Sequence, residues 1–463
     1  MKTKAKIKPP VTAGKEYTIE IVGLGHSGEG VGRFRDFTVF VPNAIPGEEV
    51  KVRIREVKKN YARGELLAVL RSADQRISPV CPVYEACGGC QLQHMAYGEQ
   101  LNWKRRVVAD ALQRIGKLAS VIVHPTIGVR EPWYYRNKMQ YPVGEKNGQI
   151  VAGCFARGTH RIIDTTHCAI QHPLNNEIAG QVKEVLQMLG ISVYDEATGR
   201  GLVRHILGRV GVKTGELMLV LVTNGPELPF LRELIDQLRQ RLPQLVSIVQ
   251  NINTRNTNII LGEQTHTLWG RDTITDYIGP FKFNISARSF FQVNTAQAEI
   301  LYAKALEYAG LTGRETVIDA YCGTGTITLF LAQKARYIYG IEVVPEAIAN
   351  ARENAALNAV DNVEFLVGDT VELMPHMFAQ GVRPEVIVVD PPRAGCAREV
   401  LDTFISMRPQ RIVYVSCNPS SLARDLAYLA EHAFVTREVT PVDMFPQTSH
   451  VESVVWVQRK DSP

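Results

Sequence analysis

Cys417 is the residue of this sequence whose position best suits covalent chemistry. It follows Ser416 and the run 413–415 of apolar and β-branched residues, and a turn at Asn418 and Pro419 leads into a helical pattern. Such a run before a helix is typical of a strand in an open α/β sheet, and side chains at the carboxyl ends of these strands face the ligand crevice. A thiol in that place is a candidate nucleophile, although a small cysteine buried in the core fits the same local pattern.

The residues around two other strand ends are of the types that bind a nucleoside. The strand-like run 316–320 leads into a turn with Tyr321, Gly323 and Gly325, and the next strand ends at Glu342. Glycines let the backbone approach a ligand closely, and an acid about 20 residues further on suits the ribose hydroxyls. Because the turn lacks the third glycine of a dinucleotide fingerprint, the pattern favours S-adenosylmethionine over NAD.

Two more carboxylates follow strands later in the chain. Asp369 ends a third strand-like run and is a candidate contact for the adenine, and Asp390 ends the run 386–389. The two prolines after Asp390 would hold a rigid loop beside the cofactor. This alternation of strands and helices predicts a Rossmann-like α/β domain over residues 281–463, with a nucleoside cofactor such as S-adenosylmethionine.

The cysteines predict a second site. Cys81, Cys87 and Cys90 have the spacing C-x5-C-x2-C, and Cys154 and Cys168 are the nearest later candidates for a fourth ligand. Both Zn²⁺ and a 4Fe–4S cluster accept four thiolates, but the two C-x2-C pairs of the usual zinc site are absent. A compact triplet with one distant cysteine therefore favours the iron–sulfur cluster.

Two further regions precede this α/β domain. Residues 1–73 combine short strand-like runs with glycine turns and hold 14 Lys and Arg against 8 Asp and Glu. They predict an all-β barrel of the oligonucleotide-binding kind with a basic face for a polyanion. Residues 74–280 alternate strands with helices and contain the clustered cysteines, so we expect a central α/β domain that carries the iron–sulfur site.

The composition is that of a globular protein, with 45% apolar and 21% charged residues among 463. No run is as long as a membrane span, and the basic start lacks the apolar stretch of a signal peptide. We therefore expect a cytoplasmic protein with no membrane partner. Eight cysteines in unevenly spaced groups argue for metal binding or catalysis rather than a disulfide framework.

Several motifs, in one order along the chain, resemble those of the RNA uracil-5-methyltransferase family. They are residues 289–294, 319–325, 390–393, 415–419 and 443–452. Residues 23–33 and 41–48 are similar to the TRAM domain, an RNA-binding barrel attached to RNA-modifying enzymes. The resemblance therefore covers nearly the whole chain.

The cysteines are similar to those of one branch of this family. Cys81, Cys87, Cys90 and Cys168 match the iron–sulfur ligands of the enzymes that modify 23S ribosomal RNA. The tRNA branch typically lacks both the TRAM domain and the cluster. The resemblance thus implies methylation of uridine C5 in 23S rRNA to give 5-methyluridine, with S-adenosylmethionine as methyl donor.

The resemblance also implies roles for individual residues. Cys417 would add to uracil C6, and Glu452 would remove the C5 proton so that the thiol is expelled. The residues against the cofactor or the base would be Gln292, Tyr321, Gly323, Glu342, Asp390 and Asp369. The uridine must leave its RNA stack to reach the thiol, while the TRAM domain would hold phosphates. We expect the enzyme to act as a monomer.

Other functions fit parts of the same pattern. A tRNA uracil-5-methyltransferase shares the motifs, and an RNA cytosine-5-methyltransferase also uses a thiol at C6 of the base. A non-catalytic RNA-binding protein with a methyltransferase fold is the alternative outside enzymes. Intact Cys417 and Glu452 argue against that last possibility.

Overall fold

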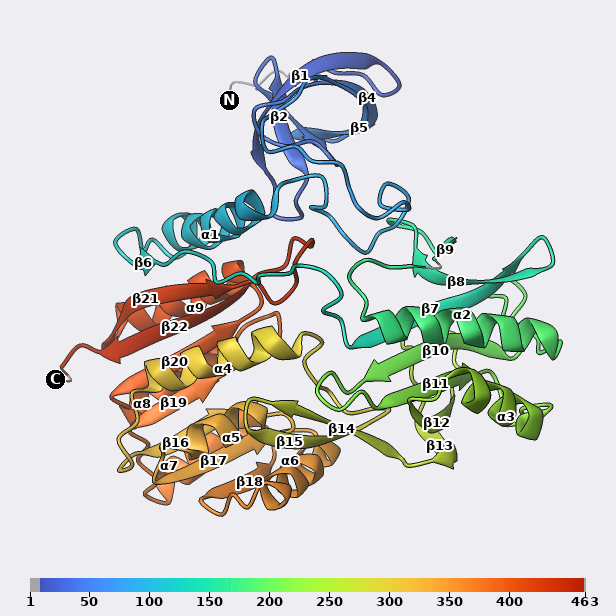
Figure 1. The fold of residues 1–463 in the computed structure, drawn as a ribbon. Helices are drawn as coiled ribbons and strands as arrows, with labels where there is room; N and C mark the ends of the chain where they lie inside the picture. The colour runs from blue at the N-terminus through green and yellow to red at the C-terminus, as the bar shows by residue number, and fades with distance from the viewer. Residues whose placement is uncertain (1–8, 166, 462–463) are drawn as a thin grey trace.

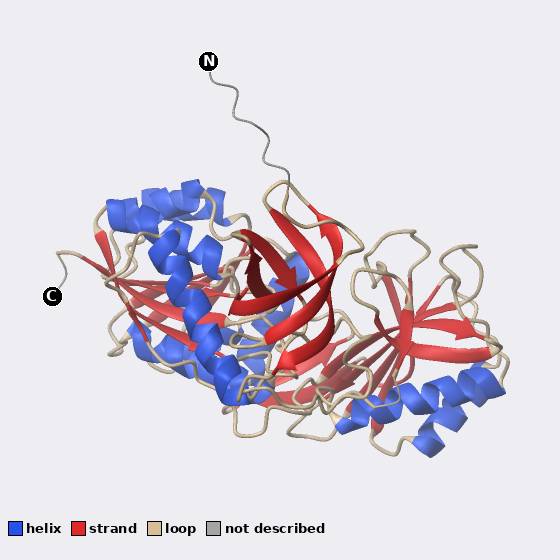
Figure 2. Ribbon diagram, turned by 90° about the horizontal axis from the view of Figure 1, so that it is seen from above, coloured by secondary structure: helices blue, strands red, loops and turns tan. Residues whose placement is uncertain are grey.

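The computed structural model describes residues 9–165 and 167–461, which form a small barrel, two large sheets and a hairpin (Figure 1). The barrel lies above the junction of the two large sheets in Figure 1, and the view from above shows it between them (Figure 2). Within the described ranges, no helix has the length and apolar character needed to cross a membrane.

The barrel closes in the strand order β1-β2-β3-β5-β4. Its strands are β1 (Glu16–Leu24), β2 (Gly30–Phe34), β3 (Phe37–Val41), β4 (Glu49–Val57) and β5 (Tyr61–Arg71). Along β4, Val50, Val52 and Ile54 point into the barrel, and the basic side chains between them point outward. On that outer face Lys51 and Arg53 pair with Glu16, so part of its charge is neutralised.

The C-terminal sheet contains eight strands in the order β18-β17-β16-β19-β20-β22-β21-β6. The strands from the C-terminal part are β16 (Thr316–Ala320), β17 (Tyr337–Glu342), β18 (Val363–Val367), β19 (Val386–Val389), β20 (Arg411–Ser416), β21 (Phe434–Val442) and β22 (Glu452–Arg459). The strand order reverses between β16 and β19, and a ligand crevice forms outside the carboxyl ends of the strands at such a point.

Six helices accompany these strands along the chain. They are α4 (Thr295–Ala309), α5 (Thr326–Ala332), α6 (Pro345–Leu357), α7 (Thr370–Ala379), α8 (Arg398–Met407) and α9 (Pro419–Glu431). The parallel strands β16, β19 and β20 are buried on both faces, and their apolar side chains divide between two large core clusters.

The central sheet has seven strands in the order β13-β12-β11-β10-β7-β8-β9. They are β7 (Lys138–Lys146), β8 (Gln149–Phe155), β9 (Ile162–Asp164), β10 (Val203–Val210), β11 (Leu217–Thr223), β12 (Leu245–Ile252) and β13 (Gln264–Gly270), with helices α2 (Pro173–Met188) and α3 (Leu231–Arg241). All residues of β11 are buried, which places this strand at the core of the sheet.

Segments from residues 74–280 also complete the C-terminal part of the fold. Helix α1 (Tyr97–Arg114) packs on α9 and β21, and β6 (Ile122–Val123) pairs in parallel with β21 at the edge of the sheet. The hairpin β14 (Thr273–Ile278) and β15 (Phe281–Ser286) spans position 280 and packs on α4 and α6. The two sheets are therefore joined by packing as well as by the chain.

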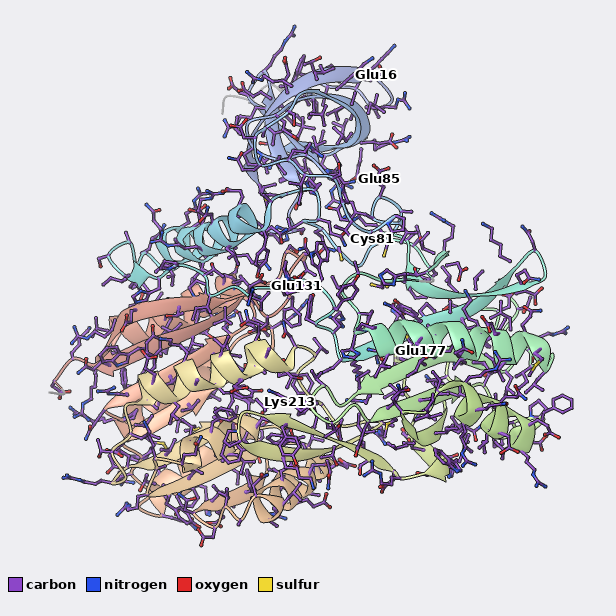
Figure 3. The ribbon with its side chains drawn as sticks, in the orientation of Figure 1. Glu16, Cys81, Glu85, Glu131, Glu177 and Lys213 are labelled. Carbon is purple, nitrogen blue, oxygen red and sulfur yellow. The ribbon has the colours of Figure 1, made fainter. Side chains whose placement is uncertain are left out.

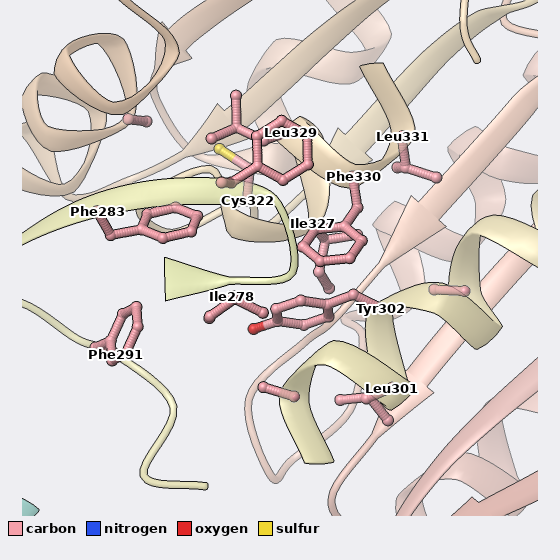
Figure 4. Packing of buried hydrophobic residues seen from close by; sticks show 14 of the residues in the cluster. Ile278, Phe283, Phe291, Leu301, Tyr302, Cys322, Ile327, Leu329, Phe330 and Leu331 are labelled. Carbon is pink, nitrogen blue, oxygen red and sulfur yellow. The ribbon is translucent and has the colours of Figure 1, made fainter. Parts of the chain in front are cut away.

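A shared aromatic core fixes the hairpin against the C-terminal sheet (Figure 4). The ring of Tyr302 on α4 lies 5.3 Å from that of Phe330 on α5, measured between centroids, and Phe281 packs on Phe330 at the same separation. The Tyr302 hydroxyl accepts a hydrogen bond from Thr326 Oγ1 at 3.1 Å. This core thus brings α4 and the start of α5 together at the crevice.

Candidate active site

Cys417 and Glu452 lie at the same end of two neighbouring strands. Ser416, the last residue of β20, pairs with Ser453 of β22, and the two strands are antiparallel. Cys417 and Glu452 are the next residues beyond that pair, both are partly buried, and both line one cavity of about 1370 Å³. The register of the sheet therefore brings the predicted nucleophile and the predicted base to one place.

The surroundings of these two groups change their protonation. Burial raises the pKa of the Cys417 thiol to about 11, and the carboxylates of Glu452 and Asp390 add to the rise, whereas Arg393 lowers it. Burial also raises the pKa of Glu452 well above its ordinary value. Asp390 adds to this rise, and Arg393 opposes it. The thiol is therefore protonated near neutral pH, and Glu452 has the raised proton affinity that a general base needs.

The turn that carries Cys417 is tied to the loop that carries Arg393. Asn418 Nδ2 donates to the Arg393 carbonyl at 2.9 Å, and Ser421 Oγ donates to the same oxygen at 3.1 Å. Asn418 also caps α9, since its Oδ1 accepts from Ser420 N at 3.0 Å. Cys417 therefore lies just before the positive end of a helix, which favours a thiolate.

Arg393 was not predicted as a site residue, although it ends the Asp-Pro-Pro-Arg loop. It is exposed and lines the cavity, and it opposes the pKa rise of both Cys417 and Glu452. The sequence signal was its place directly after two prolines, because a rigid loop holds its last side chain in a fixed direction.

Five of the six predicted cofactor residues share this cavity with Cys417 and Glu452. Gln292, Tyr321, Gly323, Glu342 and Asp390 all line it. Gly323 has a φ of +56°, and its N–H donates to Glu342 Oε2 at 3.3 Å. Nothing lies within 4 Å of where a Gly323 Cβ would be, so the turn leaves open space over its backbone. A glycine turn and an acid facing open space fit a nucleoside.

Asp369 takes a different position from the other predicted cofactor residues. Its side chain is exposed and caps α7, where Oδ1 accepts from Val371 N at 2.9 Å. It is not among the described residues that line the cavity, although its charge contributes to the raised pKa of Tyr321. The geometry therefore assigns Asp369 a capping role beside the cofactor residues.

The loop that carries Gln292 is held by the central sheet. Asn137 Nδ2 donates to the Gln292 carbonyl at 2.9 Å, and Asn137 N donates to Val293 O at 2.9 Å. Arg209 donates through Nη2 to the carbonyls of Ser289 and Ala287 at 2.5 and 3.2 Å. These buried contacts were not evident from the sequence, because they join residues far apart in the chain.

The five clustered cysteines also line this cavity. Cys81, Cys87, Cys90, Cys154 and Cys168 all face it, and Cys81 lies between the barrel and the central sheet (Figure 3). Cys90 packs with Cys81 and Cys168 in one cluster, while a Cβ on Gly89 would lie 3.4 Å from the Cys87 sulfur and 3.7 Å from that of Cys154.

The cysteine side chains do not form a compact single-ion site. Among the described residues, no three His, Cys, Asp or Glu side chains are arranged to hold a metal ion. The five clustered cysteines that line the cavity supply thiols, the ligands that iron–sulfur clusters require.

Comparison with known proteins gives the family. Residues 230–460 match the tRNA (Uracil-5-)-methyltransferase family, and residues 10–67 match the TRAM domain. An uncharacterized RNA methyltransferase of Halalkalibacterium halodurans is 51% identical over 457 residues, which cover 99% of this chain and 100% of that protein. Another from Bacillus cereus is 49% identical, with coverage of 98% and 99%. The chain belongs to the RNA uracil-5-methyltransferase family.

A solved structure agrees with this assignment. The tRNA (uracil-54, C5)-methyltransferase of Pyrococcus abyssi, in complex with S-adenosyl-L-homocysteine, is 28% identical with a TM-score of 0.76. The match covers 95% of this chain and 100% of that one. The present methyltransferase therefore uses S-adenosylmethionine to methylate uracil C5 in RNA, and its N-terminal barrel is a TRAM domain.

Proposed function

We propose that this methyltransferase makes 5-methyluridine in 23S rRNA, with Cys417 as nucleophile and Glu452 as general base. The observation that carries the proposal is the position of the two residues beyond the Ser416–Ser453 pair, in one cavity with the predicted cofactor residues. The choice of 23S rRNA as the substrate is supported by the joint presence of the TRAM domain and the clustered cysteines.

The reaction begins at the thiol. Cys417 gives its thiol proton to water, and its sulfur forms a bond to uracil C6 while the C5–C6 π electrons move onto C5 and O4. Arg393 and the start of α9 favour the thiolate, whereas the carboxylates of Glu452 and Asp390 disfavour it. S-adenosylmethionine, when bound, supplies the methyl group that C5 takes up.

Glu452 completes the reaction. After methylation, C5 carries both a hydrogen and the methyl group, and C6 remains bonded to sulfur. The Glu452 carboxylate takes the C5 proton, the electrons of the C–H bond form the C5–C6 double bond, and the C6–S bond breaks to release Cys417. Its raised pKa suits this transfer, because a more basic carboxylate accepts the proton more readily.

The proposal assigns the cofactor to the strand ends of the crevice. Gly323 would let the backbone approach the nucleoside, and Glu342 would accept hydrogen bonds from the ribose. Tyr321, Asp390 and Gln292 would contact the cofactor or the uracil, and Asp369 would act from its cap position on α7.

We also propose that Cys81, Cys87, Cys90 and Cys168 hold a 4Fe–4S cluster. The packing of Cys90 with Cys81 and Cys168 supports this set, and the position of Cys154 beside Cys87 makes it the alternative fourth ligand. A cluster there would tie the segment after the TRAM domain to the central sheet, so its contribution would be structural support or RNA binding.

The RNA would be held by the TRAM domain while one uridine turns out of its stack into the cavity. The enzyme would act as a cytoplasmic monomer without a membrane partner. A tRNA substrate is the second candidate, because the Pyrococcus abyssi relative acts on uracil-54 of tRNA.

Incubation with labelled S-adenosylmethionine tests the proposal. Unmodified 23S rRNA and tRNA are offered in parallel to wild type and to Cys417→Ala, and the nucleosides are then analysed. We expect 5-methyluridine in 23S rRNA with wild type alone. Label in tRNA alone would assign the second candidate, and label in another nucleoside, or an equally active variant, would overturn the mechanism.

A further inference from the structure

The segment 443–451, which leads into Glu452, is unusual for a connection between two antiparallel strands. It joins β21 to β22, has no sheet partner and is nevertheless buried over most of its length. Buried backbone groups outside regular structure need hydrogen-bond partners from elsewhere. Glu452 pairs with Val442 at the start of β22, so the groups that hold this segment act together with the sheet to position it.

One of these groups is a lysine without access to solvent. Lys104 on α1 forms an ion pair with Asp443, and both side chains are 0% exposed. Lys104 Nζ also donates to the Phe445 carbonyl at 3.1 Å, and Asp443 Oδ2 accepts from Tyr97 OH at 2.9 Å. Of the ion pairs between described residues, this is the one with both side chains completely buried.

A second contact lies one helical turn away on the same face of α1. Gln100 Nε2 donates to Gln447 Oε1 at 2.9 Å, and Gln447 N donates to Gln100 Oε1 at 3.2 Å. The Gln447 carbonyl accepts from the N–H groups of Gln91 and Leu92, both at 3.0 Å. These two residues follow Cys90 directly, so the cysteine segment and the Glu452 segment are hydrogen-bonded to each other.

Helix α4 holds the same segment from another side. Gln297 Nε2 donates to the Asp443 carbonyl at 3.0 Å, and Asn294 Nδ2 donates to the Met444 carbonyl at 3.1 Å. With α1 and α4 both bonded to its first residues, the segment has one defined path to Glu452.

We infer that the buried Lys104–Asp443 pair is a positioning device for Glu452, an inference that rests on the proposed function of that residue. A buried ion pair adds little net stability compared with apolar side chains of the same volume. Its bonds are directional, however, and removal of one partner leaves a buried charge that must either become neutral or move toward water. Lys104 is completely buried and is not among the described residues that line the cavity, so we infer that it acts through the segment.

The proton-removal step distinguishes this role from general support of the fold. If Glu452 is displaced, methyl transfer still occurs, but the adduct between Cys417 and methylated RNA persists because the C5 proton stays. Glu452→Gln should trap that adduct directly. Lys104→Met should trap it too, since a misplacement of about 1 Å can slow a step by about 100-fold.

The test measures the fraction of enzyme linked to RNA in denaturing gels after one turnover with S-adenosylmethionine. The RNA is 23S rRNA, or tRNA if wild type methylates that instead. The matched control is Arg76→Met, which breaks the Arg76–Glu48 pair, where Glu48 is fully buried in the barrel. We expect adduct with Lys104→Met and Glu452→Gln, the wild-type level with Arg76→Met, and unchanged affinity of Lys104→Met for S-adenosylmethionine.

Other outcomes separate the inference from the proposed function. Slow turnover of Lys104→Met without adduct, while Glu452→Gln traps it, would overturn the positioning role alone. A Glu452→Gln variant that turns over normally would overturn the function proposed for that residue. If Lys104→Met does not fold, the double variant Lys104→Met/Asp443→Leu removes both charges. Adduct in the double variant supports the inference, and a wild-type level of adduct overturns it.

Discussion

Ser416 and Ser453 face each other across strands β20 and β22. Since Cys417 and Glu452 are the next residues at the same end, the sheet itself brings the two groups together. A shift of one residue in this register would turn the side chains of one strand to the opposite face of the sheet. The pairing of the core strands thus sets the positions of Cys417 and Glu452, and the segment 443–451 adjusts the position of Glu452.

Replacement of Cys417 by alanine should abolish methylation while leaving cofactor binding intact. We expect kcat to fall by at least about 1000-fold, because C5 is not activated without addition at C6. Calorimetric titration with S-adenosylhomocysteine should give the wild-type Kd. A weakened Kd would mean that the thiol instead supports the cofactor site.

The rate at which iodoacetamide alkylates Cys417 should depend on the charged groups around its thiol. The rate at this peptide, followed by mass spectrometry, should rise about tenfold per pH unit between pH 7 and 10, because the thiol pKa is about 11. Glu452→Gln removes a negative neighbour and should lower the pKa, so alkylation at pH 8 becomes faster. Arg393→Gln should raise the pKa and make it slower. The reverse order would show that other groups control the thiol.

Glu342→Gln should weaken cofactor binding. The Glu342 carboxylate accepts from the N–H groups of Gly323 and Val344, and charged hydrogen bonds contribute about 1.5–3 kcal/mol each. We expect Kd for S-adenosylhomocysteine to rise about 10- to 100-fold in calorimetry. The control Glu353→Gln changes an exposed residue of α6 and should leave Kd unaltered.

Asn137→Ala should impair the use of RNA and weaken the affinity for S-adenosylhomocysteine, because Gln292 is proposed to contact the cofactor or the uracil. It removes the side-chain donor that holds the Gln292 carbonyl, at an expected cost of about 1–3 kcal/mol in unfolding free energy. We expect KM for RNA to rise in initial-rate assays. Asn251→Ala is the matched control, since this asparagine makes similar hydrogen bonds within the central sheet. An equal rise of KM in both variants would contradict a local effect.

Iron analysis should identify the fourth cluster ligand. We expect Cys168→Ser to lower iron bound per chain after anaerobic purification, because Cys168 packs with Cys90 and Cys81. Cys154→Ser should retain iron. The opposite pattern would make Cys154 the ligand, and wild type without iron or zinc would remove the cluster from the proposal.

Much of the catalytic half could be predicted from local patterns. Strand ends at Glu342, Asp390 and Cys417 are readable because an apolar run, a turn and a helix follow one another within a few residues. The family assignment was confirmed in its coarser form, and the iron–sulfur cluster and the 23S rRNA substrate stay predictions.

Contacts between segments that are far apart in the chain could not be predicted from the sequence. A lysine on an amphipathic helix such as α1 is ordinarily exposed, and only the fold reveals that Lys104 meets Asp443, which lies 339 residues further along. The same holds for Asn137 and Arg209, whose partners belong to another domain. Asp369 illustrates a different limit, because an acid after a strand can cap the next helix as well as face the crevice.

The pairing of β6 with β21 bears on how the protein can be divided. A fragment that begins at residue 281 would contain every residue proposed for catalysis, yet β21 would become a bare edge strand, which promotes aggregation. It would also leave Asp443 with no counter-charge and strip the apolar cover that α1 gives to α9. We therefore expect the full chain to be active and the fragment from residue 281 to be inactive.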